Sequence, residues 1–228
     1  MSRQGSRRQE QGVRLVKSAV RLEKVSKSFK KEKVLKNISH SFEQGKIHGI
    51  MGFNGSGKTV MFKCICGFLK PDKGAVYVQD RRIGRDIDFP ESVGMIIESP
   101  GFLPHLSGYA NLKRLADIRK KIGEEEIREA MAQVGLDPFS KKKTGQYSLG
   151  MRERLGIAQA IMEDPALLVL DEPFNGLDKR GAEEVCCLLD GLRKRGRTIL
   201  VAAHNMLEIE YLCDTVCEMD AGVLTQVK

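Results

Sequence analysis

The chain has 228 residues, of which 41% are hydrophobic and 30% are charged, a size and composition typical of a globular protein with a full core. No apolar run approaches the roughly 18 residues that a membrane-spanning helix needs, and the basic N-terminus lacks the apolar segment of a secretory signal. The formal charge of +8 comes from the start of the chain: residues 1–36 hold 12 Lys and Arg against 3 Asp and Glu, whereas the rest holds 26 against 27.

This distribution of charge bears on possible partners. A near-neutral body argues against nucleic acid, whose binding requires a basic face. We interpret residues 1–18 as a basic, flexible extension. Attraction of this extension to anionic lipid at a membrane surface is the alternative.

Cysteine usage favours a reducing compartment. None of the six cysteines belongs to a CxxC pair, and most fall in apolar helix or strand patterns. Buried, reduced thiols are therefore expected, as in a cytosolic protein. The four histidines show no metal-ligand spacing.

In the first hundred residues, short apolar runs alternate with turns around one helix. Alternation and apolar runs predict strands at 20–24, 38–42, 46–51, 75–78 and 93–97. The strand at 46–51 runs directly into a Gly-rich loop, which opens an apolar helix at about 58–69.

Residues 99–143 differ in character. Pro and Gly residues make a loop, and two charged, helix-prone segments follow at about 109–120 and 124–134. We interpret the region of about 99–163 as a helical insertion. Beyond it we expect strands at 166–170, 198–202 and 215–219, and helices at 179–194 and 205–212. Strands that alternate with helices predict an α/β fold with a mostly parallel sheet covered on both faces.

The Gly-rich loop at 52–59, GFNGSGKT, matches the pattern G-x-x-x-x-G-K-[ST] between a strand and a helix. Its glycines let successive backbone N–H groups point at a phosphate, and the helix N-terminus and Lys58 add positive charge. The Thr59 hydroxyl is suited to bind Mg²⁺. The candidate nucleotide-binding residues of the loop are Gly52, Asn54, Gly55, Ser56, Gly57, Lys58 and Thr59. By itself, such a loop does not separate kinases, GTPases and transport ATPases.

Two carboxylates follow the apolar strand at 166–170. In a parallel sheet Asp171 emerges beside the phosphate loop, where it can hold Mg²⁺. Glu172 can orient and deprotonate a water molecule in line with the γ-phosphate. Without the phosphate loop, a pair of surface carboxylates at a strand end would be the preferred interpretation.

With these motifs in place, the chain after about residue 19 resembles the ABC ATPase family. The segment 147–151, YSLGM, resembles the family's signature, and the segment 175–178, NGLD, resembles its dimer-contact loop. His204 stands where the family keeps its switch histidine, and Phe29 stands at the adenine-stacking position. Alone, Phe29 would be read as a core aromatic and His204 as a loop residue.

The resemblance implies a P-loop NTPase fold, with an antiparallel β subdomain and a helical insertion in a single domain at 19–228. It implies ATP and Mg²⁺ as cofactors. It further implies a second ATPase subunit, with a homodimer favoured, whose Ser148 and Gly150 close over the nucleotide bound by the first. A separate membrane-spanning permease is the other implied partner.

Departures from the family pattern bear on the subtype. Leu149 replaces the first signature glycine, Met151 replaces a glutamine, and Asn175 replaces a serine. Glu98 occupies the place of the usual loop glutamine, which contacts the Mg²⁺ shell. The segment 98–102, with the signature, is similar to bacitracin-resistance and lantibiotic-immunity exporters.

We therefore expect the ATP-hydrolysing subunit of an exporter at the cytoplasmic face of the membrane. The alternative is a soluble ABC ATPase without a permease, acting on nucleic acid, ribosomes or cluster assembly. The long coiled coil and the tandem cassettes of such proteins are missing from these 228 residues. An importer ATPase would usually carry an additional C-terminal regulatory domain.

Overall fold

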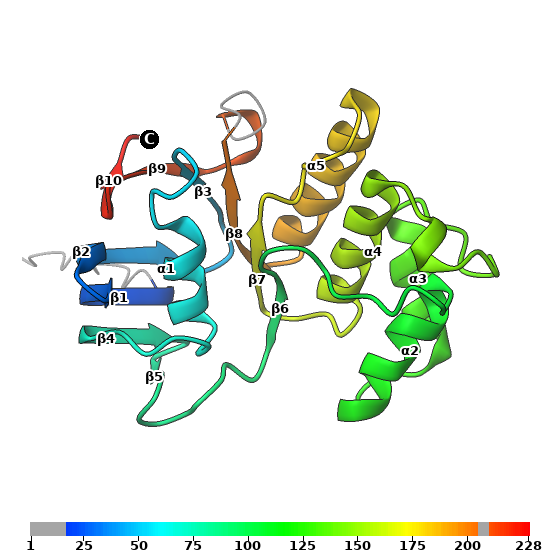
Figure 1. Cartoon of the computed structure of the whole chain (residues 1–228), viewed down its shortest axis with the longest axis horizontal. Helices are drawn as coiled ribbons and strands as arrows, with labels where there is room; N and C mark the ends of the chain where they lie inside the picture. Colours follow the sequence, from blue (N-terminus) through cyan, green and yellow to red (C-terminus); the bar gives the residue numbers. More distant parts are fainter. Residues whose placement is uncertain (1–16, 205–209) are drawn as a thin grey trace, which may run out of the picture.

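The computed structural model describes residues 17–204 and 210–228, which form two β-sheets and a set of helices (Figure 1). A four-stranded antiparallel sheet has the order β2-β1-β4-β5. Its strands are β1 (Ser18–Phe29), β2 (Glu32–Glu43), β4 (Lys73–Val78) and β5 (Arg81–Arg82). This sheet is the antiparallel part that the family resemblance implied.

The six-stranded sheet has the order β10-β9-β3-β8-β7-β6. Its strands are β3 (Ile47–Met51), β6 (Val93–Ile96), β7 (Leu167–Asp171), β8 (Thr198–Ala203), β9 (Thr215–Asp220) and β10 (Val223–Gln226). All its pairs are parallel except that of β9 with β10. Parallel pairing brings the carboxyl ends of β3, β6 and β7 to one edge of the sheet, where the phosphate loop begins.

The six-stranded sheet separates two apolar clusters. Along β7, Leu168 and Leu170 belong to one cluster, whereas Leu167 and Val169 belong to the other. Because successive side chains of a strand point to opposite faces, this division shows that the sheet is buried on both sides. It explains why β7 is apolar at every position up to Asp171.

The helices are α1 (Lys58–Ile65), α2 (Gly108–Arg119), α3 (Glu124–Gln133), α4 (Leu149–Ile161) and α5 (Lys179–Lys194). Helix α1 lies between the two sheets, and α2, α3 and α4 gather at the opposite end of the molecule from the four-stranded sheet (Figure 1). None of the described helices is both long and apolar enough to cross a membrane.

Helix α4 packs unusually closely on β6 and on the loop that follows it. A Cβ atom added at Gly94 of β6 would lie 1.8 Å from the carbonyl oxygen of Ala160, so no side chain fits there. One placed at Gly156 would lie 2.8 Å from Cγ of Pro100. These glycines let the backbone of α4 rest directly against the strand and loop.

The fold agrees with the predicted α/β architecture, with a few local differences. Helix α1 ends at Ile65, before the predicted 69, because the chain turns at Gly67 with φ of 85°. The short edge strands β5 and β10 had not been predicted. Residues 205–209 of the expected helix at 205–212 lie outside the described ranges, and residues 210–212 are helical. The limits of the N-terminal extension and of the helical insertion remain predictions.

Candidate functional site

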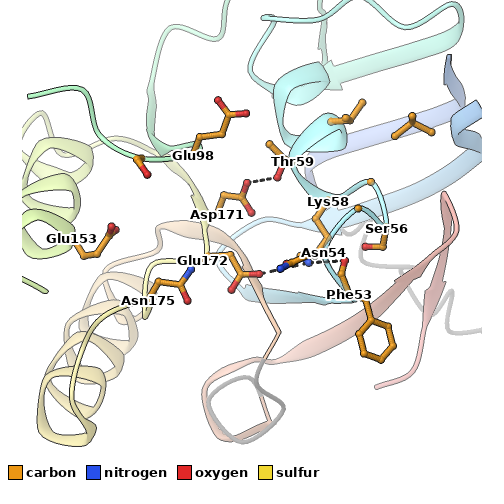
Figure 2. Close-up of a pocket in the computed structure, with 15 residues that line it drawn as sticks. Phe53, Asn54, Ser56, Lys58, Thr59, Glu98, Glu153, Asp171, Glu172 and Asn175 are labelled. Carbon is orange, nitrogen blue, oxygen red and sulfur yellow. Dashed lines mark hydrogen bonds and ion pairs between the residues drawn. The ribbon is translucent and has the colours of Figure 1, made fainter. Parts of the chain in front are cut away.

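A cavity of about 560 Å³ opens where the phosphate loop meets the carboxyl ends of β6 and β7 (Figure 2). One side is formed by residues 53–60, and the other carries Glu98, Glu153, Asp171 and Glu172. The sheet topology explains this meeting, because loops that leave neighbouring parallel strands share one edge. The phosphate loop and the pair Asp171 and Glu172 therefore meet although they lie more than 100 positions apart in the chain.

The phosphate loop has a backbone that only glycine allows at two positions. Gly52 has φ of 157°, and a Cβ atom there would lie 2.3 Å from the carbonyl oxygen of Met219. Gly57, directly before α1, has φ of 115°, and its Cβ atom would lie 3.0 Å from the carbonyl oxygen of Val34. Side chains are thus kept out of the loop, which leaves its backbone amides open to a phosphate.

Lys58 carries the positive charge of this loop into the cavity. Its side chain is only 5% exposed, and its Nζ donates hydrogen bonds to the carbonyl oxygens of Gly52 (2.6 Å) and Phe53 (3.3 Å). The same nitrogen lies 3.5 Å from Oε1 of Glu172. A buried ammonium group needs such partners, and here they hold it beside the loop amides.

Thr59 and Asp171 form a pair of oxygen groups next to Lys58. The Thr59 hydroxyl donates a hydrogen bond of 2.5 Å to Oδ2 of Asp171. Asp171 is 7% exposed, and its Oδ1 has no hydrogen-bond partner among the described residues. Burial raises the pKa of Asp171, against the lowering effect of the Thr59 hydrogen bond. The open carboxylate oxygen beside a hydroxyl fits Mg²⁺, which favours oxygen ligands and keeps positions for water and phosphate.

Glu172 occupies a strained position at the end of β7. Its φ is 55°, and its N–H donates to the carbonyl oxygen of Ala202 at 2.9 Å. One carboxylate oxygen, Oε2, lies 2.6 Å from Nδ1 of His204, which orients the side chain. The other, Oε1, is buried with no hydrogen-bond partner in the described part of the chain, and it faces the cavity near Lys58 (Figure 2). A backbone held in the left-handed region often marks a functional position.

Glu98 and Glu153 complete the acidic wall of the cavity. Glu98 has φ of 62° and forms an ion pair of 2.6 Å with Lys63, with its side chain largely exposed. Its expected contact with Mg²⁺ stays a prediction. Glu153 was not predicted as a site residue; it is 8% exposed, and burial raises its pKa. The sequence could have indicated Glu153, because it follows the signature-like segment as a carboxylate on a helix face that is otherwise mostly apolar.

Three predicted residues lie away from this cavity. Ser148 caps α4, where its Oγ accepts a hydrogen bond of 3.2 Å from Met151 N–H. Gly150 lies against the loop after β7, near the carbonyl oxygen of Gly176. Phe29 ends β1, is 43% exposed and has Lys27 Nζ 5.6 Å from its ring centre. The cavity lining includes none of the three.

Comparisons with known proteins agree with this geometry. A protein-family model described as ABC transporter matches residues 35–175. The chain is 42% identical over 200 residues to the ABC transporter ATP-binding protein YybJ of Bacillus subtilis (88% of this chain, 92% of YybJ). It is 37% identical to the bacitracin transport ATP-binding protein BcrA of Enterococcus faecalis (93% and 70%) and 33% identical to the lantibiotic transport ATP-binding protein SrtF of Streptococcus pyogenes (86% and 85%).

Among solved structures, the chain is similar to the ATP-binding cassette MJ0796, solved as a dimer in a post-hydrolysis state with ADP and Pi. The TM-score is 0.83 at 25% identity, over 92% of this chain and 98% of MJ0796. The site, the family match and these relatives lead to one conclusion. The chain belongs to the ABC transporter family, as an ATP-binding subunit that hydrolyses ATP.

Proposed function

We propose that this subunit drives an exporter that removes peptide antibiotics of the bacitracin or lantibiotic kind from the bacterial cell envelope. The observation that carries the ATPase part is the single cavity that joins Lys58, the Thr59–Asp171 pair and Glu172. The substrate class is supported by the names of BcrA and SrtF and by the segments 98–102 and 147–151, which are similar to those exporters.

Each residue of the cavity has a proposed role. The loop amides and Lys58 bind the β- and γ-phosphates of ATP, because a buried cation and free N–H groups match phosphate oxygens. Thr59 and Asp171 hold Mg²⁺, with Glu98 as a further contact; when bound, this ion neutralises charge that develops on the phosphoryl group. Glu172 takes the proton from the attacking water, and His204 keeps its carboxylate in position. Phe29 stacks against the adenine.

A second copy of the chain is proposed to complete the site. Ser148 and Gly150 do not line the cavity of their own chain, and Leu149 between them is 50% exposed. At the N-terminus of α4 they offer a hydroxyl, N–H groups and a favourable helix dipole to a phosphate. The dimer seen for MJ0796 supports this arrangement. We favour a homodimer, in which two copies bind two nucleotides.

The partner that crosses the membrane is proposed to be a separate permease, which would place the subunit at the cytoplasmic face. A groove of about 250 Å³ runs between the edge strand β6 and helix α2, and Ile118 at its rim is 76% exposed. The partly buried Val93 and Leu115 lie in the same groove, and a group of apolar side chains at the surface is typical of a protein-binding site. We propose that the permease binds in this groove.

Purification from native cells tests this function. The tagged subunit is expected to bring down a membrane protein, and Ile118→Glu is expected to reduce that recovery at least about tenfold, since a charge is buried in an apolar contact. Nucleotide binding by Ile118→Glu should remain unchanged, which would show that the variant is folded and that the lower recovery reflects weaker binding of the membrane protein. Deleting the gene should sensitise cells to a peptide antibiotic. Recovery of ribosomes or DNA in place of a membrane protein would overturn the proposal.

A further inference from the structure

The loop between β7 and α5 carries both Glu172 and Asn175, and its two ends are well anchored. At one end the N–H of Glu172 donates to the carbonyl oxygen of Ala202. Within the loop, Asn175 N–H donates to the carbonyl oxygen of Glu172 at 3.2 Å. At the other end Asp178 caps α5 by accepting a hydrogen bond of 2.8 Å from Gly181 N–H. Asn175 reaches toward Glu172 at the cavity (Figure 2).

The middle of this loop rests on the side chain of Leu149. A Cβ atom added at Gly176 would lie 2.4 Å from Cγ of Leu149 and 2.5 Å from Cδ2. These distances mean that the leucine already packs against the backbone of Gly176, with no room for a methyl group between them. A Cβ atom at Gly150 would in turn lie 2.8 Å from the carbonyl oxygen of Gly176. The loop and the first turn of α4 are therefore in close contact.

Helix α4 is a firm support for this contact. Its first turn is closed by the Ser148 cap. Further along, it is fixed by the close approaches of Gly156 to Pro100 and of Ala160 to Gly94. Leu149 is the first residue of this helix, so its side chain is presented from a rigid element to an exposed glycine of the loop. A packed side chain of this kind can hold a neighbouring backbone in one position.

We propose that Leu149 is a positioning residue for ATP hydrolysis. Its side chain supports the backbone at Gly176 and thereby holds Asn175 and Glu172 in the geometry needed for attack by water. The leucine occupies a place where a glycine would leave that backbone unsupported. This inference rests on the proposed role of Glu172, because it explains how that carboxylate is kept in place. Leu149 itself does not line the cavity of its own chain.

The first test compares Leu149→Ala with Leu149→Met. Leu149→Ala should lower kcat about tenfold with KM and ADP affinity unchanged within about twofold, since displacing a reacting group by a fraction of an ångström affects the chemical step and leaves binding intact. Leu149→Met, which keeps a long apolar side chain, should retain at least about half of the wild-type kcat. Val223→Ala is the control, because it trims another half-exposed aliphatic side chain far from the loop and should change neither constant.

Single-turnover measurements separate positioning from misfolding and from association. The amplitude of the single-turnover reaction counts the sites that can hydrolyse ATP, and for Leu149→Ala it should equal that of wild type. The rate of hydrolysis at each site should be lower. The experiment is run at a protein concentration where doubling the concentration leaves the rate per chain unchanged. A reduced amplitude with a normal rate would mean a purely structural role and would overturn the proposal. An unchanged rate would also overturn it.

The second test changes Gly176, the other residue of the contact with Leu149. Gly176→Ala should lower kcat, because its methyl group collides with Cγ and Cδ2 of Leu149 and because the backbone there has φ of 72°, which disfavours any side chain. Leu149→Ala removes the colliding atoms, so the double variant should be no slower than the slower single variant. Losses that multiply would show two independent effects and contradict the inference. Failure of the proposed role of Glu172 would be seen separately, because Glu172→Gln would then hydrolyse ATP within a few-fold of wild type.

Discussion

Two groups of candidate residues in this chain differ in how their polar atoms are used. In the cavity, Lys58, Thr59, Asp171 and Glu172 are largely buried and bind one another by hydrogen bonds and ion pairs. At the start of α4, Ser148 is exposed, and its oxygen serves its own helix. The first group thus gathers within one chain the residues that we propose to bind phosphate and Mg²⁺. The second group can contact a nucleotide only when that nucleotide is bound by another chain, as expected for a site shared between two subunits.

The largest effect is expected from a change that removes the charge of Glu172 in the cavity but keeps the shape of its side chain. Glu172→Gln should leave ATP binding intact and reduce hydrolysis about 100-fold or more, the usual contribution of a general base. The amide still reaches His204 and Lys58 but cannot accept a proton from water. Binding is measured by titration and turnover by phosphate release. Turnover within a few-fold of wild type would remove Glu172 from this role.

Lys58→Ala removes the positive charge from the same group of cavity residues. Nucleotide affinity should fall about 10- to 100-fold, which corresponds to the loss of hydrogen bonds from one charged group. Lys63→Ala is the matched control on the same helix, because Lys63 is also a lysine of α1 but does not line the cavity and pairs with Glu98. Its ADP affinity should stay within about threefold of wild type. Equal losses in both variants would show that the general charge of α1 matters rather than the position of Lys58.

Two serines that cap helices allow the role of Ser148 in hydrolysis to be separated from its role in stability. Ser148 caps α4 and Ser107 caps α2, and each accepts a hydrogen bond of 3.2 Å from the backbone N–H three residues on. Replacing either by Ala should cost about 1 kcal/mol of stability, a fall of about 2–4 °C in melting temperature for a domain of this size. Ser148→Ala alone should also slow hydrolysis about tenfold, through the lost hydroxyl contact to a phosphate.

ADP affinity of a single chain should be unaffected by either cap variant, because Ser148 lies outside the cavity. If Ser107→Ala slowed hydrolysis as much as Ser148→Ala, the effect would come from stability alone. The second group would then lose its proposed part in the site.

Thiol labelling gives the smallest expected effect and tests how tightly α1 is enclosed. Burial raises the pKa of Cys64 to about 11 and that of Cys66 to about 12, so both should resist iodoacetamide at pH 8. Cys187 on α5 is exposed and should react first. Mass spectrometry after digestion locates the label, and ATPase activity should be retained. Early labelling of Cys64 would mean that the packing beneath the phosphate loop opens readily.

Sequence patterns identified the elements that surround the cavity because those elements are long and strongly apolar. The buried strands β3, β7 and β8 and the loop at 52–59 follow from local residue order alone. Strand β5, with only Arg81 and Arg82, has no apolar alternation and could not be seen. The early end of α1 could have been predicted from Gly67, a residue that commonly follows a helix.

Contacts between distant segments were beyond the sequence. The ion pair of Glu98 with Lys63 joins residues 35 positions apart and depends on how the loop after β6 lies against α1. The burial of Glu153 depends on the packing of α4 against the loop after β6. Likewise, Leu149 looked like a departure from the signature, and only its contact with Gly176 suggests a use for it. These relations come from tertiary packing, which one sequence does not encode in any short pattern.

The absence of a side chain at Gly94 has a mechanical consequence. A methyl group there would push on Ala160, near the end of a helix that measures about 20 Å at 1.5 Å per residue. With the contact between Gly156 and Pro100 as a pivot, Ser148 lies about 12 Å to one side and Ala160 about 6 Å to the other. The helix would then act as a lever with a gain of about two. The hydrogen atom that Gly94 carries in place of a side chain thus keeps Ser148 at the position where we propose that a second subunit binds.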